Sequence, residues 1–421
     1  MAKPTIRFRG FDDEWEQRKF DDLADYKKGP FGSALKKDMF VPKSDMTVKV
    51  YEQQNAINKD WHLERYFITE EYANKLSGFR VEGGDIIVSC AGTIGETYEI
   101  PLDAEPGIIN QALMRIKVKE SIVNKKMFNI LFTNMIDDFT RVHSNGSAIK
   151  NIPPFSDLKP MVVFVPKMDE QNKISSYLSN LDHLITLHQR KCDETKKLKK
   201  YMLQKMFPQN GRKVPEIRFK GFTDEWEQRK LEEFGKATGG TSIESEFSED
   251  GIYKVISIGS YSENSVYNDQ GIRAIKSDKT SNRVLNRNNL TMILNDKTTS
   301  GNIIGRVLLI EESGIYVYNQ RTERIEINLD EYDPVFLYEM LNAPNIREKI
   351  IKQAQGNTQI YVNWTAISLL EYMIPSKEEQ VKIGEYLHSI SNLITLHQHK
   401  CEELKKLKKF MLQNMFTQKN K

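Results

Sequence analysis

Two stretches of the chain place apolar residues in alternating steps of four and three, the spacing of a helix that packs along a seam. The first stretch follows Pro166 and predicts a long helix over residues 169–208, because Pro208 cannot continue it. The second follows Pro375 and predicts a long helix over residues 376–421. At 1.5 Å per residue, a helix of about 40 residues is roughly 60 Å long.

The seam of the first helix is apolar at its start and polar further on. His188 and Cys192 continue the spacing, whereas Thr195 and Lys199 interrupt it. A 3.5-residue spacing of this length favours a coiled coil, so we expect the two helices to pair antiparallel and bring the chain ends together. Two separate helices, each packed on its own domain, are the alternative. The predicted interface residues are Ile174, Leu178, Leu181, Ile185, Ile383, Leu387, Ile390 and Ile394.

The helices belong to a tandem repeat with a period of about 210 residues. Residues 6–19 return nearly unchanged as residues 217–230, and the lysine-rich stretch 196–200 returns as 405–409. Between these stretches lie two blocks of about 140 residues that share little sequence. A period this long indicates two copies of a whole domain rather than a solenoid. A constant helical frame with divergent inserts is typical of a scaffold that carries two different binding domains.

The two divergent blocks follow one mixed plan in which strands predominate. Their apolar runs are bounded by glycine and proline, which is typical of strands. A short helical segment follows the strands in each block. The predicted strands cover residues 84–89, 107–116, 290–294 and 315–320, and the predicted short helices cover residues 125–132 and 335–341.

These elements divide the chain into domains. The first globular domain covers residues 1–168 and the second covers residues 217–375, with a polar, turn-rich linker at 209–216. The predicted fold class is α+β. Two similar mixed α/β domains are separated by two long antiparallel coiled-coil helices, in a pseudo-two-fold tandem repeat.

Composition indicates the cellular compartment of the protein more clearly than its function. The net charge is +3 although 28% of the residues are charged, so binding to nucleic acid depends on how the cations cluster. Three sparse cysteines are typical of reduced thiols in a cytosol. No apolar run approaches the roughly 20 residues that span a membrane, and the N-terminus lacks the apolar core of a signal peptide. We therefore expect a soluble, cytoplasmic protein.

Motifs of catalysis are missing from the sequence. It contains neither a GxxxxGK[ST] phosphate loop nor a GxGxxG turn after a strand. The segment Asn151-Ile152-Pro153-Pro154-Phe155 approaches an amino-methyltransferase tetrapeptide, but the inserted isoleucine breaks its geometry. The seven histidines show no metal-ligand spacing. We expect the chain to bind no cofactor or metal and to catalyse no reaction on its own.

Loops in both blocks combine small residues, amides and cations, the mixture that suits phosphate contacts and base-edge recognition. For any single loop, an ordinary solvated turn is an equal alternative, and the lysine runs also suit the solvated face of a coiled coil. Recurrence at matching places in both blocks favours DNA binding. The candidate DNA-binding residues are Lys27, Lys28, Ser33, Lys36, Lys37, Thr93, Asn145, Ser147 and Lys150 in the first block, and Thr241, Ser242, Lys297, Thr298, Thr299, Ser300, Asn357, Thr358, Gln359 and Tyr361 in the second.

Taken together, these features resemble the specificity subunit of a Type I restriction–modification system. The resemblance covers essentially the whole chain. It rests on the repeat openings at residues 15–20 and 226–231, on the two loops that contain Gly146 and Gly356, and on the starts of the long helices. The most specific carriers are the segments from Pro166 to Gln171 and from Pro375 to Gln380.

The resemblance implies two target-recognition domains, each reading half of a split DNA site, with the helices acting as a ruler. It implies two methyltransferase subunits that hold S-adenosylmethionine and methylate adenine, and separate restriction subunits that use ATP and magnesium. It also implies a prokaryotic host. A non-catalytic protein-interaction scaffold that carries two binding domains is the alternative.

Overall fold

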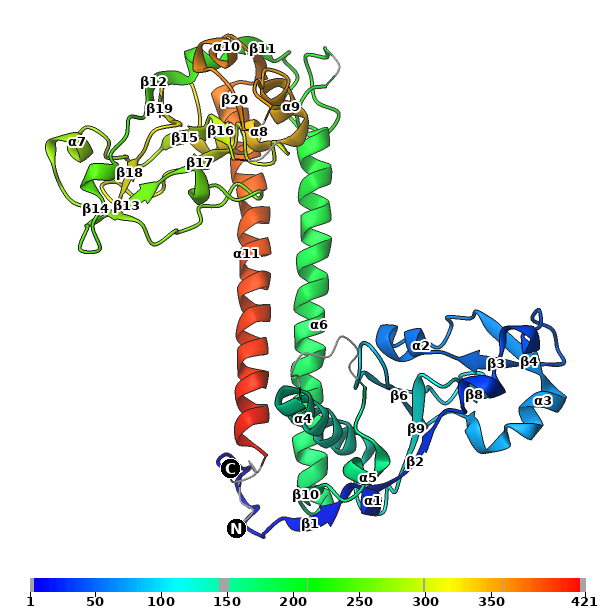
Figure 1. The fold of residues 1–421 in the computed structure, drawn as a ribbon. Coiled ribbons are helices and arrows are strands. Elements are labelled where there is room, and N and C mark those ends of the chain that lie inside the picture. The colour runs from blue at the N-terminus through cyan, green and yellow to red at the C-terminus, as the bar shows by residue number, and fades with distance from the viewer. Residues whose placement is uncertain (1–3, 144–150, 210, 298–299, 358, 417–421) are drawn as a thin grey trace. The chain divides into compact units, whose positions relative to one another are not determined.

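The structure is a computed structural model, and it forms two compact units. One unit is Met1–Ile185 with Glu403–Lys421, and the other is Thr186–Glu402. Each unit contains one globular domain and segments of both long helices (Figure 1). The described residues are 4–143, 151–209, 211–297, 300–357 and 359–416.

The two long helices are α6, Met168–Lys205, and α11, Lys377–Asn414, each of 38 residues. Helix α6 ends three residues before its predicted end at residue 208 because Met206 and Phe207 turn into the core of the second domain. Helix α11 ends at Asn414, and the last part of its predicted range, residues 417–421, lies outside the described residues.

In the second unit the two helices run antiparallel. His188 Nδ1 and His397 Nδ1 lie 3.1 Å apart, a contact in which one imidazole donates and the other accepts. Further along α6, Lys199 Nζ donates to Ser391 Oγ at 2.7 Å. Residue numbers therefore rise on one helix as they fall on the other. The antiparallel pairing predicted from the repeat is confirmed.

The first unit shows the same pairing near the ends of the chain. Lys408 Nζ on α11 donates to Asp182 Oδ1 on α6 at 2.5 Å. The backbone N–H of Ile6 donates to the carbonyl of Asn414 at 2.9 Å, so the N-terminal segment lies against the end of α11. The predicted proximity of the two chain ends is confirmed for the residues described.

The polar interruption at Lys199 has a structural reason. Lys199 Nζ lies 2.8 Å from Glu339 Oε2, and the Glu339 side chain on α8, Pro334–Asn342, is buried. A buried carboxylate requires a cation and hydrogen-bond donors. The lysine that breaks the apolar spacing therefore joins α6 to α8 and, through Ser391, to α11.

The predicted seam residues pack on more than the opposite helix. In the first unit they share a core cluster with the first domain and with Leu404 of α11. In the second unit Ile383 and Leu387 share a cluster with the second domain and with Leu203 of α6. Each helix start is thus held by its own domain and by the other helix. The buried seam residues are Ile174, Leu178, Leu181, Ile383, Leu387 and Ile390, and the half-buried ones are Ile185 and Ile394.

The first domain contains two four-stranded sheets. The sheet with the longer strands, called the larger sheet below, has the order β2-β9-β6-β7 and is antiparallel throughout. The smaller has the order β4-β3-β8-β5, with β3 and β8 parallel. The strands are β2 Ala24–Lys28, β3 Thr47–Tyr51, β4 Tyr66–Thr69, β5 Arg80–Val81, β6 Ile86–Ser89, β7 Thr97–Glu99, β8 Gly107–Ile109 and β9 Leu113–Val118.

The single strand predicted at residues 107–116 is wrong. The structure has two strands there, β8 and β9, and they belong to different sheets. Between them the Asn110 side chain accepts from the N–H of Ala112, and the N–H of Leu113 donates to the Asn110 carbonyl. This tight turn moves the chain from one sheet to the other, which an apolar run does not reveal.

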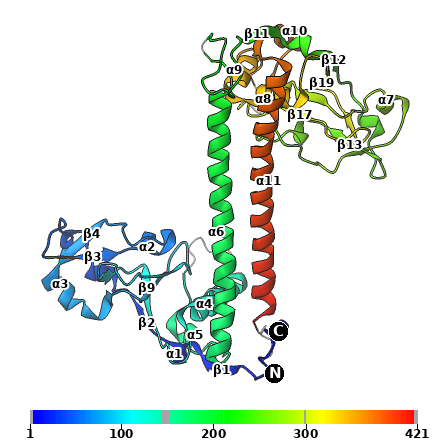
Figure 2. The ribbon, with the colours of Figure 1, turned by 180° about the vertical axis from the view of Figure 1, so that it is seen from behind.

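The second domain repeats this plan, seen from behind in Figure 2. Its larger sheet has the order β12-β19-β15-β17 and its smaller sheet the order β14-β13-β18, with β13 and β18 parallel. The predicted fold class is confirmed. The strands are β12 Gly235–Gly239, β13 Tyr253–Ile256, β14 Arg273–Ala274, β15 Asn289–Ile293, β17 Val307–Leu309, β18 Tyr316–Tyr318 and β19 Thr322–Ile327.

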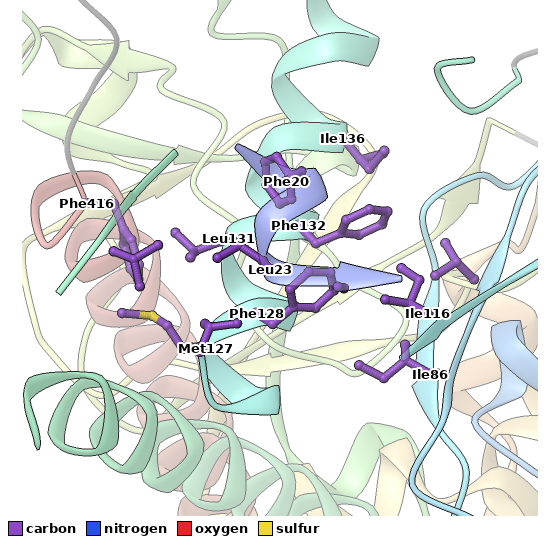
Figure 3. Close-up of a cluster of buried hydrophobic side chains, with 14 of the residues drawn as sticks. Phe20, Leu23, Ile86, Ile116, Met127, Phe128, Leu131, Phe132, Ile136 and Phe416 are labelled. Carbon is purple, nitrogen blue, oxygen red and sulfur yellow. The ribbon is translucent and has the colours of Figure 1, made fainter. Parts of the chain in front are cut away.

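Each domain also contains a two-stranded sheet next to the start of its long helix, and helices that pack on its larger sheet. In the first domain α4 supplies much of the core, and Figure 3 shows its Met127, Phe128 and Leu131 between Ile116 of the sheet and Phe416. The remaining elements are β1 Glu16–Lys19, α1 Phe20–Leu23, α2 Gln53–Asn58, α3 Glu70–Lys75, α4 Lys125–His143, α5 Phe155–Leu158, β10 Val162–Val165, β11 Glu227–Lys230, α7 Asp278–Ser281, β16 Asn295–Asp296, α9 Pro344–Ile351, β20 Ile360–Tyr361, α10 Trp364–Ser368 and β21 Glu371–Ile374, with β1 paired to β10 and β11 to β21.

Candidate nucleic-acid interface

Backbone hydrogen bonds tie four loops of the second domain together at one end of its larger sheet. The N–H of Gly240 donates to Thr322 O at 2.8 Å, and the N–H of Leu294 donates to Arg321 O at 2.9 Å. The N–H of Val362 donates in turn to Leu294 O at 2.9 Å. We call residues 239–242, 294–297, 320–322 and 359–362 the second-domain edge.

The second-domain edge brings together candidate residues that are far apart in the sequence. It contains Thr241, Ser242, Lys297, Gln359 and Tyr361. The pairing of β16 with β20 fixes the last of these loops against the residues just before Lys297. Hydroxyl, amide and ammonium groups are thus presented on one edge, a combination suited to phosphate and base contacts.

The first domain has a corresponding edge. The N–H of Gly29 donates to Leu113 O at 2.8 Å, and the N–H of Cys90 donates to Ala112 O at 2.8 Å. The N–H of Ile152 donates to Cys90 O at 3.1 Å. We call residues 28–29, 90–93, 111–113 and 151–152 the first-domain edge, which includes the candidates Lys28 and Thr93.

Four first-domain candidates lie away from this arrangement or are already engaged. Ser33, Lys36 and Lys37 sit in short turns on either side of Leu35, which is buried with the smaller sheet. Lys27 places its ammonium 4.8 Å from the centre of the Phe79 ring. The structure therefore brings Lys28 and Thr93 to one edge but spreads the other four over the domain surface.

The described candidates share one property, exposure to solvent. This leaves each of them accessible to a large ligand. The exposed candidates are Lys27, Lys28, Ser33, Lys36, Lys37, Thr93, Thr241, Ser242, Lys297, Ser300, Asn357, Gln359 and Tyr361. The candidates outside the described residues are Asn145, Ser147, Lys150, Thr298, Thr299 and Thr358.

Two further residues contact these edges and were missed in the sequence. Arg283 donates from Nη1 to Gly239 O at 2.8 Å and from Nη2 to Thr241 Oγ1 at 3.1 Å. Gln53 Nε2 donates to Ala91 O at 2.6 Å on the first-domain edge. Both lie tens of residues from the loops they contact, so no local spacing signals them.

The structure offers little sign of other chemistry. Within the described ranges, no group of three or more histidine, cysteine, aspartate or glutamate residues is placed to hold a metal ion. The three cysteines are buried and form no disulfide. No helix in the described part of the chain is both long and apolar enough to cross a bilayer.

Two similar domains with different exposed edges, each joined to its own long helix, are typical of a scaffold that carries two binding domains. A family model for the Type I restriction modification DNA specificity domain matches residues 12–197 and 223–406. The chain therefore belongs to the Type I restriction–modification specificity-subunit family, as its sequence motifs indicated.

Individual relatives agree with this assignment. The chain is 24% identical, over 323 residues and 74% of each chain, to the Type I restriction enzyme MjaVIII specificity subunit of Methanocaldococcus jannaschii. Its fold is similar to the Type I S subunit from M. genitalium, with a TM-score of 0.63, 15% identity and coverage of 99% and 100%. A chain from a structure of type I system assembly and conformational transition gives a TM-score of 0.52 and 13% identity, covering 97% and 98%.

Proposed function

We propose that each domain of this specificity subunit reads one half of an asymmetric, bipartite DNA site. The observation that carries the proposal is the contrast between the two edges. The sheets share strand order, but the first-domain edge presents Lys28 and Thr93 where the second-domain edge presents Thr241, Lys297 and Tyr361. Two identical readers would select a palindrome, whereas two different readers select unlike half-sites.

The proposal is tested by co-expressing the chain with its methyltransferase and mapping methylated adenines across the host genome. We expect a split, non-palindromic motif. Exchange of residues 17–165 for the equivalent segment of another family member should change one half-site and leave the other unchanged. A motif that changes in both halves, or no new methylation from a soluble, assembled complex, would contradict the proposal.

The protein-interaction scaffold remains the alternative that this experiment rejects or supports. A direct comparison uses the salt dependence of binding to duplex DNA that contains the mapped motif. Neutralising phosphates releases counterions, so DNA binding should weaken steeply with salt, on the order of 10³-fold or more between 50 and 200 mM for six or more phosphate contacts. Binding that barely changes over this range would favour the scaffold.

We further propose that α6 and α11 each dock one methyltransferase subunit. Large apolar side chains are exposed at matching positions of the two helices, and a repeated patch suits two copies of one partner. In this assembly the chain itself holds no cofactor; S-adenosylmethionine belongs to the methyltransferases, and ATP and magnesium to the restriction subunits. The patch residues are Leu187, Leu198 and Tyr201 on α6, and Leu396, Leu407 and Phe410 on α11.

Introducing a negative charge into each apolar patch tests this docking. Leu198→Asp and Leu407→Asp should each reduce the methyltransferase content of the complex from two copies to one, and the double variant should bind none. Leu102→Asp is the matched control, because Leu102 is 88% exposed on the loop after β7 of the first domain and belongs to neither long helix. Native mass spectrometry counts the copies, and a double variant that still binds two would refute the patch.

A further inference from the structure

A buried carboxylate lies beside the second-domain edge. Glu323 is only 6% exposed, and on β19 it lies directly opposite Gly239 of β12 and Met292 of β15. Side chains alternate between the faces of a strand, so Glu323 shares a face with Ile325, which is in the domain core. A carboxylate in such a place ordinarily carries a hydrogen-bonded partner.

Among the described residues, no hydrogen bond engages the Glu323 carboxylate, and the only opposing influence on its burial is the charge of Arg283. The charge of Arg283 acts on this carboxylate, but its guanidinium donates to the Gly239 carbonyl, Thr241 and Tyr318 instead. Burial raises the pKa of the Glu323 carboxyl to about 7, and Arg283 lowers it only in part. Its acceptor capacity is thus unused within the described part of the chain.

Gly239 leaves this carboxylate open from one side. Gly239 is exposed on the outermost strand of the sheet, and a Cβ atom there would come within 3.3 Å of Glu323 Oε2. Any larger side chain would lie over the carboxylate. A ligand that approaches the edge across Gly239 can therefore reach Oε2.

The first domain differs at the same pair of positions. The last pair of the β2–β9 ladder is Lys28 with Met114, and the last pair of the β12–β19 ladder is Gly239 with Glu323. The first domain therefore places an apolar, fully buried methionine beneath an exposed lysine. At the matching positions, the second domain has the hydrogen-bond acceptor Glu323 beside Gly239. The change in chemistry falls where the two edges differ.

We propose that Glu323 is a specificity-determining residue that accepts a hydrogen bond from the exocyclic amino group of one base in the second half-site. Cytosine N4 and adenine N6 present such donors in the major groove, and a carboxylate is the usual partner of cytosine N4. Arg283 and Thr241 flank the approach across Gly239. The inference rests on the proposed division of the DNA site between the two domains.

The test compares Glu323→Met and Glu323→Gln with the wild type by mapping methylated adenines from the complete complex. Met reproduces the residue of the first domain, and Gln keeps the size while adding an amide donor. We expect both variants to keep the first half-site, and Glu323→Met to lose the preference for one base at one position of the second by about ten-fold or more. Glu323→Gln keeps an accepting oxygen and adds a donor, so it should weaken a preference for cytosine and keep one for adenine. A cytosine at that position would identify N4 as the donor, and an adenine would identify N6.

One control variant and three possible outcomes make the test decisive. Glu249→Gln, an exposed carboxylate of the same domain, should leave the motif unchanged. A motif identical to that of the wild type in both Glu323 variants would overturn the inference, as would loss of the entire second half-site from a folded, assembled complex. If the wild-type complex itself yields no split motif, it is the proposed function that fails, and the two failures are distinguished.

Discussion

At the scale of single residues, Glu323 is a residue whose proposed role in recognition comes at a cost in stability. A carboxylate that is buried without a partner destabilises the fold whenever it is ionised. Such groups are found at functional sites more often than elsewhere, because a binding partner supplies what the protein does not. The methionine at the matching position of the first domain shows that the sheet itself has no need of a charge there.

This cost predicts a pH-dependent difference in stability. The carboxyl has a pKa of about 7 in the folded chain and an ordinary value of 4.5, so between these values the folded chain keeps a proton that the unfolded chain releases. The associated stability is complete below about pH 4.5 and is lost as the pH rises to 7. Glu323→Gln cannot ionise, so its free energy of unfolding should exceed that of the wild type by about 3 kcal/mol at pH 8 and by clearly less at pH 5.5.

Urea unfolding of the second domain at the two pH values measures this difference. Glu249→Gln serves again as the control, since its carboxyl is exposed and should shift neither midpoint. An advantage of Glu323→Gln that is the same at pH 5.5 and pH 8 would mean that ionisation of Glu323 does not destabilise the folded domain.

At the scale of elements, the repeated sequence at each helix start forms a clamp. In the first copy, Arg7 donates from Nε and Nη2 to both oxygens of Glu170 at 2.7 Å, and Trp15 Nε1 donates to Glu170 at 3.2 Å. In the second copy, Arg218 binds Glu379 in the same bidentate way at 2.7 and 2.8 Å. Each clamp joins the opening segment of a domain to the start of its long helix.

The glutamine after each clamp glutamate also joins the start of the long helix to its domain. Gln171 Nε2 donates to the carbonyls of Pro166 and Ile122, and Gln380 Nε2 donates to those of Pro375 and Glu331. In both copies the proline lies five residues before the glutamine. The Pro-to-Gln motif therefore has a structural explanation, because its Glu and Gln side chains fix the angle at which the domain meets the helix.

Removal of one clamp charge should destabilise the unit that contains it. Glu170→Gln leaves a half-buried guanidinium without its ion pair, which we expect to cost about 3 kcal/mol. Glu379→Gln should cost somewhat less, because Trp226 Nε1 has no partner within the described chain and no indole bond is lost. Urea unfolding followed by tryptophan fluorescence measures both variants.

The matched control is Asp13→Asn, which breaks the exposed ion pair between Asp13 and Lys167 at the same joint. Exposed pairs contribute little, so this variant should unfold like the wild type. If it lost as much stability as Glu170→Gln, the joint would depend on surface charge rather than on the buried clamp.

These elements also show what the sequence could predict. The long helices follow from a period that persists over many turns, and their pairing follows from the repeat. The chain reversal at Asn110 and the ends of the helices depend on tertiary packing, which local pattern does not encode. The recognition edges were predicted only in part, because Arg283 and Glu323 reach them from distant strands and loops.

At the scale of the whole molecule, the repeat maintains the frame and varies the edges. Clamps, helix starts and the antiparallel seam recur in both units, so a change in one recognition edge leaves the other unit intact. Under the proposed function, this separation would allow one half-site to change while the other is kept. The same proposal requires that parts shared by the two copies set the distance between the half-sites, and the helices are the longest of these.

Insertion of one heptad into both α6 and α11 tests that role. Seven residues preserve the seam and add about 10.5 Å of helix, which equals roughly three base pairs at 3.4 Å per step. We expect the mapped motif to keep both half-sites and to gain a spacer longer by about that amount. Seven polar residues inserted into the linker at 211–216 are the control and should leave the spacer as it was. An unchanged spacer in the heptad variant, from a complex that still methylates DNA, would show that the helices hold the domains without measuring the distance between their targets.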